Sequence, residues 1–149
     1  MFNVISVTPV LSLAAYTAND VAGALLTFAG AASVYANEGR IRRITVIDAD
    51  KEKAAGKIYF FNADPSAAAK TDAAEFLPAA ADLAKLIAVK AIAAADFVDS
   101  SSDSVAVYET DIPFVLAAGG TSLFAVFVCD ATPTYTAADD LIIKLVISR

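Results

Sequence analysis

The sequence contains no histidine and no tryptophan, and its only cysteine is Cys129. Without histidine, catalytic triads that use a histidine base and metal sites that use imidazole ligands are excluded. A single cysteine excludes thiolate zinc clusters, redox CxxC pairs and an intramolecular disulfide. Because Cys129 lies within an apolar run, we interpret it as a small packed side chain.

Charged residues are scarce, at 19% of the chain, and the formal net charge is −6. Phosphate recognition needs clustered lysine and arginine, and the only basic cluster is the short run 40–43. The sequence therefore predicts no direct contact with nucleic acid. Gly119 and Gly120 form a bare pair that is typical of a turn and not of a phosphate-binding loop.

Carboxylates are the remaining candidates for chemistry. A calcium loop would need more oxygen ligands at regular spacing than Asp48, Asp50 and Glu52 supply. Five further acids lie in or beside a polar segment: Asp96, Asp99, Asp103, Glu109 and Asp111. We interpret them as solvated residues and not as the paired acids of a glycosidase. We therefore expect a protein that is not an enzyme and that uses no cofactor and no metal.

Long hydrophobic runs are also missing. The longest weakly polar run, 21–36, is shorter than the ~20 residues that a spanning helix requires, and it contains Gly23 and Gly30. The first residues carry no positive charge, so a secretory signal is not expected. We expect no membrane association.

Alternation of apolar residues is the strongest positive signal. Residues 122–129 and 141–147 alternate with a period of two in β-branched and aromatic side chains, and Pro133 lies between them. This pattern predicts two long antiparallel strands at the centre of a β-sandwich. Shorter strands are predicted at 3–7, 21–28, 40–48, 57–61, 87–94, 105–109 and 111–117, with a bulge at Gly23.

Helix is expected only between residues 64 and 86. Asp64 and Pro65 are typical of a helix start, Asp72 and Glu75 have the spacing of a capping box, and 79–86 fits a second short helix. The whole pattern predicts an all-β fold, a jelly-roll-like antiparallel sandwich of about eight strands with one or two short helical turns.

The chain length suits one domain over residues 1–149, which buries roughly 68–70% of its unfolded surface. Residues 1–8 are expected to form either a first strand or an N-terminal arm that pairs with a neighbouring subunit.

Hydrophobic residues make up 58% of the chain, which is more than one small core needs. Because large exposed apolar patches are uncommon on monomers, we expect part of this excess to cover a protein–protein contact. The N-terminal residues are candidates for strand addition to a neighbour. Tyr16, Tyr35 and Tyr135 lie near loops, where a tyrosine suits either a subunit contact or partial burial. The candidate contact residues are Met1, Phe2, Asn3, Val4, Ile5, Tyr35 and Tyr135.

A set of short motifs extends over roughly residues 16–147. They are Tyr16-x-Ala-x-Asp20-x-x-Gly23, Ile41-x-x-x-x-Val46-x-Asp48-x-x-Lys51, Phe61-x-Ala-Asp-Pro65-Ser, Ala81-Asp-Leu-Ala-Lys-Leu86, Ile112-Pro-Phe-Val-Leu116 and Pro133-Thr-Tyr-x-x-x-x-Asp140-Leu. With these motifs the chain resembles small virion proteins of tailed bacteriophages that are encoded near the major capsid protein. The motifs are structural, so no catalytic residue is carried over from the family.

This resemblance implies a β-sandwich decoration (cement) protein that clamps neighbouring capsid subunits, commonly as a trimer. Its partners would be the major capsid protein and further copies of itself, on the exterior of the virion after synthesis in the host cytoplasm. Two alternatives stay open. One is a head–tail, tail or head-fibre-base component, and the other is a carbohydrate-binding sandwich, which the absence of tryptophan disfavours.

Overall fold

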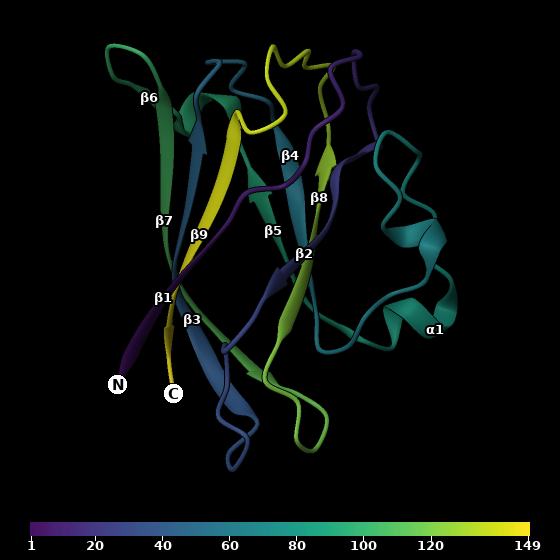
Figure 1. Ribbon diagram of the computed structural model, residues 1–149, viewed down its shortest axis with the longest axis vertical. Coiled ribbons are helices and arrows are strands. Elements are labelled where there is room, and N and C mark those ends of the chain that lie inside the picture. Colours follow the sequence, from purple (N-terminus) through teal and green to yellow (C-terminus); the bar gives the residue numbers. More distant parts are fainter.

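Two antiparallel sheets pack face to face in the computed structural model, which describes residues 1–149 (Figure 1). The first sheet contains, in spatial order, β1 (Phe2–Val7), β9 (Leu141–Ser148), β3 (Glu38–Asp48), β7 (Ser104–Val115) and β6 (Val98–Asp99). The second contains β2 (Val21–Phe28), β8 (Leu123–Cys129), β4 (Gly56–Phe61) and β5 (Leu86–Ile92). Helical structure is limited to α1 (Ala80–Leu83) and two 3-10 turns, η1 (Ala67–Ala69) and η2 (Ala94–Asp96). None of these helices has the length and apolar character needed to cross a membrane.

The strand order is that of a jelly roll. If the short β6 is set aside, each strand lies in the opposite sheet from the strand before it. The one exception is the pair β4 and β5, which are neighbours in the second sheet. The last strand, β9, returns to lie between β1 and β3, and β8 returns between β2 and β4. These are the long connections of two Greek keys. The predicted all-β sandwich is confirmed.

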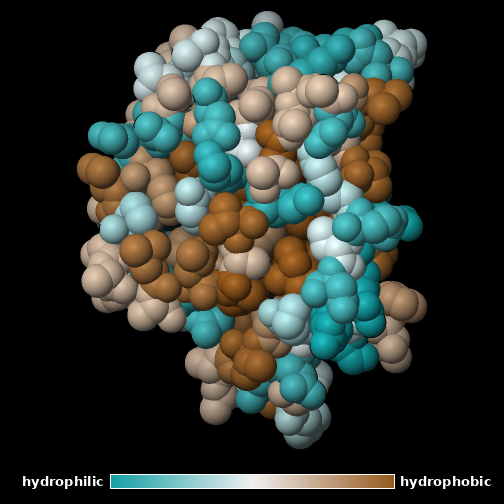
Figure 2. Space-filling model, turned by 180° about the vertical axis from the view of Figure 1, so that it is seen from behind, coloured by the Kyte–Doolittle hydropathy of each residue, from teal (hydrophilic) through white to brown (hydrophobic).

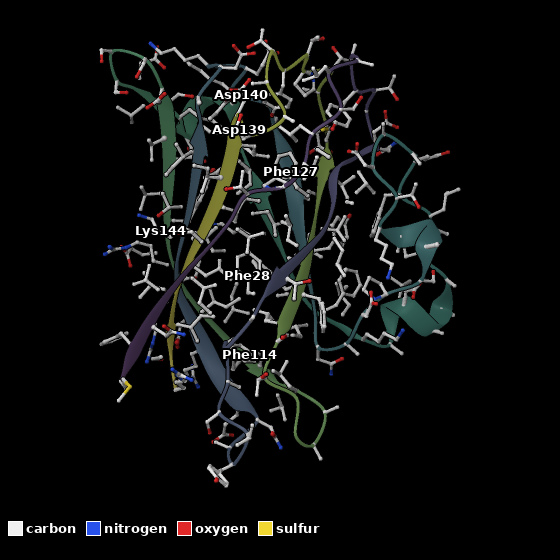
Figure 3. The ribbon with its side chains drawn as sticks, viewed as in Figure 1. Phe28, Phe114, Phe127, Asp139, Asp140 and Lys144 are labelled. Atoms are coloured by element: carbon white, nitrogen blue, oxygen red, sulfur yellow. The ribbon has the colours of Figure 1, made fainter.

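The core lies between the two sheets, where the predicted alternation of β9 sends every second side chain. Leu141, Ile143, Leu145 and Ile147 are buried, and Lys144 points away from the opposite sheet (Figure 3). Phe28, Phe114 and Phe127 lie in the space between the sheets, one each from β2, β7 and β8 (Figure 3). The period-two pattern thus places the aliphatic and aromatic residues in one continuous core.

Several elements differ from the sequence prediction. The two strands predicted at 105–109 and 111–117 form one strand, β7. β6 pairs only with the start of β7, so Pro113 lies on a free edge of the sheet, where proline is tolerated. Asp72 and Glu75 form no capping box, and instead make isolated bridges to the start of β2. Residues 2–7 form a regular strand of the first sheet, paired with β9 along its length.

Candidate interaction surface

The outer face of the second sheet is covered by the chain itself. Residues 62–85, which connect β4 to β5, cross this face, and Phe76 packs on Tyr59 with 4.5 Å between ring centroids. A second apolar cluster forms beneath the segment, and its buried members are Val21, Phe61, Val126 and Val128. The covering segment therefore buries an apolar cluster on this face, whereas Val89 of β5 stays 45% exposed.

A buried carboxylate fastens this covering segment. Asp82 accepts hydrogen bonds from the backbone N–H of Ser66 (2.7 Å), the hydroxyl of Ser66 (2.6 Å) and the backbone N–H of Ala79 (3.0 Å). The Ser66 hydroxyl and these N–H groups stabilise the charged form, so the pKa of Asp82 lies below its ordinary value. One ionised side chain thus closes the loop between η1 and α1.

Asp82→Asn is expected to loosen the covering segment at neutral pH, because an amide offers one acceptor atom in place of two. Proteolysis within residues 62–85 should become severalfold faster, as followed by mass spectrometry of the fragments. The wild-type protein should show the same opening only in acid, since a lowered pKa contributes stability above the ordinary carboxyl pKa and loses it as the pH falls through the folded value. Asp64→Asn, an exposed change in the same segment, is the control. Equal cleavage of both variants would contradict the assignment.

The outer face of the first sheet is uncovered, and most of its outward side chains are apolar. We call this surface the open face. No helix or loop lies over it, and partially or fully exposed apolar residues come from all five strands. They are Phe2, Val4, Ile47, Val98, Val105, Val107, Pro113, Val115, Ile142 and Val146. A solvated face of an antiparallel sheet is ordinarily polar, so this composition indicates a contact surface.

The charged side chains on the open face form a partly paired group of four bases and two acids. Arg40 and Arg42 both pair with Asp111, at 2.7 and 2.5 Å, and Arg43 pairs with Glu109 at 2.6 Å. An open hollow of about 510 Å³ lies beside Arg42 and Arg43. Arg43 has its own carboxylate partner, but Arg40 and Arg42 share Asp111 and Lys144 has none, so this face keeps a small positive excess.

The edges of the two sheets differ in how they are protected against strand pairing. β2 is interrupted by a bulge in which Gly23 and Ala24 have positive φ angles. β5 carries Lys90, and the exposed half of β7 carries Asp111 and Pro113. Bulges, charges and prolines are the usual means of blocking an edge. β1, with the sequence Phe-Asn-Val-Ile-Ser-Val, has none of them.

Backbone groups along β1 are free to pair. Met1 and Arg149 exchange hydrogen bonds at the end of the β1–β9 ladder, at 3.2 and 3.3 Å. Since hydrogen-bonded and non-hydrogen-bonded pairs alternate in an antiparallel ladder, the N–H and C=O groups of Phe2, Val4 and Ser6 point away from β9. β1 therefore presents an open row of donors and acceptors next to the open face.

The N-terminal contact candidates divide between the two sides of β1. Phe2 and Val4 lie on the solvent side, and Met1 is exposed because it is the chain end that precedes β1. Asn3 and Ile5 point inward, where the Asn3 amide donates to the Gly30 carbonyl at 3.0 Å and Ile5 packs on the core. Alternation along the strand explains the division, since successive side chains take opposite faces.

The two tyrosine candidates have opposite environments. Tyr35 is 96% exposed in the loop between β2 and β3, where it is available to a partner. The prediction that Tyr135 forms a subunit contact is wrong. This residue is only 2% exposed and packs edge-on against Tyr16, with ring centroids 6.3 Å apart. Burial raises the pKa of the Tyr135 hydroxyl, and the ring cannot reach another molecule in this conformation.

Potentially reactive groups have structural roles. Burial raises the pKa of the Cys129 thiol to about 12, so the nucleophilic thiolate is scarce at neutral pH. Asp48 is buried, which raises its pKa, and its carboxylate accepts hydrogen bonds from the N–H groups of Asp50 (3.0 Å) and Lys53 (2.6 Å) within one turn. No cluster of three or more potential metal ligands is present.

Sequence reasoning missed several residues of the open face. Val98, Val107, Ile142 and Val146 were assigned to strands or loops but not to a contact surface. The available signal was that two outward positions of the last strand, Ile142 and Val146, are apolar, which indicates either a covering layer or a partner. No model of a protein family matches the chain, and no curated protein matches it.

Proposed function

We propose that this protein is a structural component of a tailed-bacteriophage virion, a decoration protein that binds the outer face of the major capsid protein lattice and stabilises it. The open face supports this proposal, because it presents exposed apolar side chains from all five strands of the sheet. The jelly-roll fold, which recurs among viral capsid domains, supports it by analogy.

The proposed mechanism is adhesive. A contact of ordinary size buries about 800 Å² on each partner, and a lattice repeats it many times. When one molecule bridges two capsid subunits, the second contact forms at high effective concentration, so modest single contacts become strong binding. The β-sheet supplies a surface that needs little ordering on binding, which limits the entropic cost.

Charge distribution favours binding through the open face and not through the upper end of the molecule in Figure 1. The loops at that end carry Asp50, Glu52, Asp130, Asp139 and Asp140. Figure 3 shows Asp139 and Asp140 at this end, and hydrophilic residues cover much of it in the view from behind (Figure 2). Some of these carboxylates already have partners, such as Lys57 for Asp130 and the N–H of Ala137 for Asp140. Charged groups are costly to desolvate, so a contact through this end is disfavoured.

Val107→Asp is expected to weaken binding to capsids that lack the protein by about tenfold or more, because it places an unpaired carboxylate within the contact. Val107 is 54% exposed at the middle of β7. Val89→Asp is the matched control, since Val89 is 45% exposed on β5 of the other sheet. Co-sedimentation of purified protein with particles measures both. Equal loss in the two variants, or no binding by the wild type, would contradict the proposal.

Electron microscopy of decorated particles separates the proposed role from its main alternative. Many copies distributed over the shell would support a decoration protein. A few copies confined to one vertex would instead indicate a head–tail or tail component, which would use the same surface in a different assembly.

A further inference from the structure

We propose that β1 joins two copies of this chain into one continuous sheet, antiparallel and in a register centred on Val4. This inference does not depend on capsid binding, and it assigns the unprotected sheet edge to a second copy of the chain. It rests on the spacing of the free backbone groups, on the absence of charge along β1 and on the position of the acidic loops.

The outward-pointing N–H and C=O groups of β1 can pair with the same groups of a second copy related by a two-fold axis. They lie at Phe2, Val4 and Ser6, evenly spaced about Val4. In an antiparallel pairing centred there, Val4 faces Val4 of the second copy and Phe2 faces its Ser6. Each of these is a hydrogen-bonded pair, in which two residues exchange N–H···O bonds. Every outward backbone group of the strand therefore finds a partner in this register.

Side chains and charge also permit this approach. β1 contains no ionisable side chain, so the pairing opposes no like charges along the edge. The two-fold axis brings Val4 beside its own copy, an apolar cross-strand pair. The strands run in opposite directions, which places the acidic loops of the two copies at opposite ends of the dimer, away from the shared edge. A different partner would need a complementary strand, whereas a second copy already supplies one.

The same symmetry aligns the two open faces. The two-fold axis of an antiparallel strand pair is perpendicular to the sheet, so Phe2, Val4 and Val146 of both copies lie on the same side. The dimer therefore presents one apolar surface of twice the width. Because β1 pairs with a single strand, the assembly closes at two copies, and not at the three that the family resemblance implies.

The contact is small, so the dimer should be weak and should depend on concentration. A strand of six residues buries less than the roughly 1,200 Å² of a standard interface. Sedimentation velocity over a range of concentrations should show the wild-type protein changing from monomer to dimer.

Val4→Lys places two ammonium groups opposite each other at the axis and should raise the dimer dissociation constant by about tenfold or more. Val4→Glu should do the same with two carboxylates. An equimolar mixture of the two variants should recover dimers, because residue 4 then meets an opposite charge. Val98→Lys is the control, since Val98 is an exposed valine on β6, at the far edge of the same sheet, and its dimerisation should equal the wild type's.

Recovery in the mixture is the decisive result, since loss of folding in either variant could not produce it. A wild type that stays monomeric at the highest concentration, or dimers in Val4→Lys alone, would overturn the inference. Failure of the mixture to recover would also overturn it. Dimerisation without particle binding would leave it standing and contradict the capsid proposal instead.

Discussion

Phe127→Ala is expected to lower the free energy of unfolding by about 3–5 kcal/mol, because it removes a large buried side chain and leaves a cavity. Phe127 is fully buried in β8, where it is opposite Ala22 of β2 and Ile58 of β4. Its ring also fills the space above Gly56, where an added Cβ would lie 2.8 Å from Cζ of the ring. The Phe127 side chain thus supports the packing of β2, β4 and β8 together.

Equilibrium denaturation followed by circular dichroism measures this effect, since the chain has no tryptophan to report by fluorescence. Phe2→Ala is the matched control, because the same atoms are removed from an exposed site, and it should change stability by less than about 0.5 kcal/mol. A loss below about 1 kcal/mol in Phe127→Ala would contradict the core position of this ring.

Gly23→Ala is expected to destabilise the protein by about 2–5 kcal/mol through two separate causes. The backbone has φ of +81°, a conformation that a Cβ makes unfavourable, and an added Cβ would lie 2.2 Å from Cβ of Pro9. The N–H of Gly23 also donates to Asp72, which accepts the hydroxyl of Tyr16 as well, so the bulge cannot shift without breaking this group.

Gly119→Ala separates the two causes. Gly119 has φ of +78° but no atom lies within 4 Å of an added Cβ, so this variant carries the backbone cost alone, about 1–2 kcal/mol. The difference between the two variants measures the clash with Pro9. If both lost the same stability, the segment before β2 would not be packed against the bulge as the structure has it.

Local pattern was enough to predict the strands, because alternation reports directly on which side chains face a core. Leu141, Ile143 and Leu145 repeat with a period of two, and they are buried as expected. β7 was divided in error at Asp111, since the charge and Pro113 resemble a turn when the neighbouring strands are unknown. In the structure the strand continues through both residues. Pro113 pairs with Arg40, but Asp111 lies where the register to β3 shifts, between the pairs Ile41–Ile112 and Arg43–Glu109.

The candidate surface was less predictable, because it depends on contacts between distant residues. Asp82 fastens the covering segment through Ser66, which lies 16 residues away, and nothing in the sequence marks that pair. Which sheet is covered follows from that segment alone. Tyr135 resembles a loop aromatic in sequence, but packing against Tyr16, more than a hundred positions earlier, buries it. Alternation in the sequence shows which side chains share a face of a strand, but not whether another segment covers that face.

The two ends of the chain lie side by side, since Met1 and Arg149 close the β1–β9 ladder at the lower end of the molecule (Figure 1). A pulling force between these ends would act across the strands and along their hydrogen bonds, which in an antiparallel pair run perpendicular to the strands. The pairs would then open one after another, from Phe2 and Ser148 onward, as in a zip. In the proposed decoration role, tension would be better resisted through the broad face of the sheet, where many contacts are strained together, than through a tether attached at the two ends.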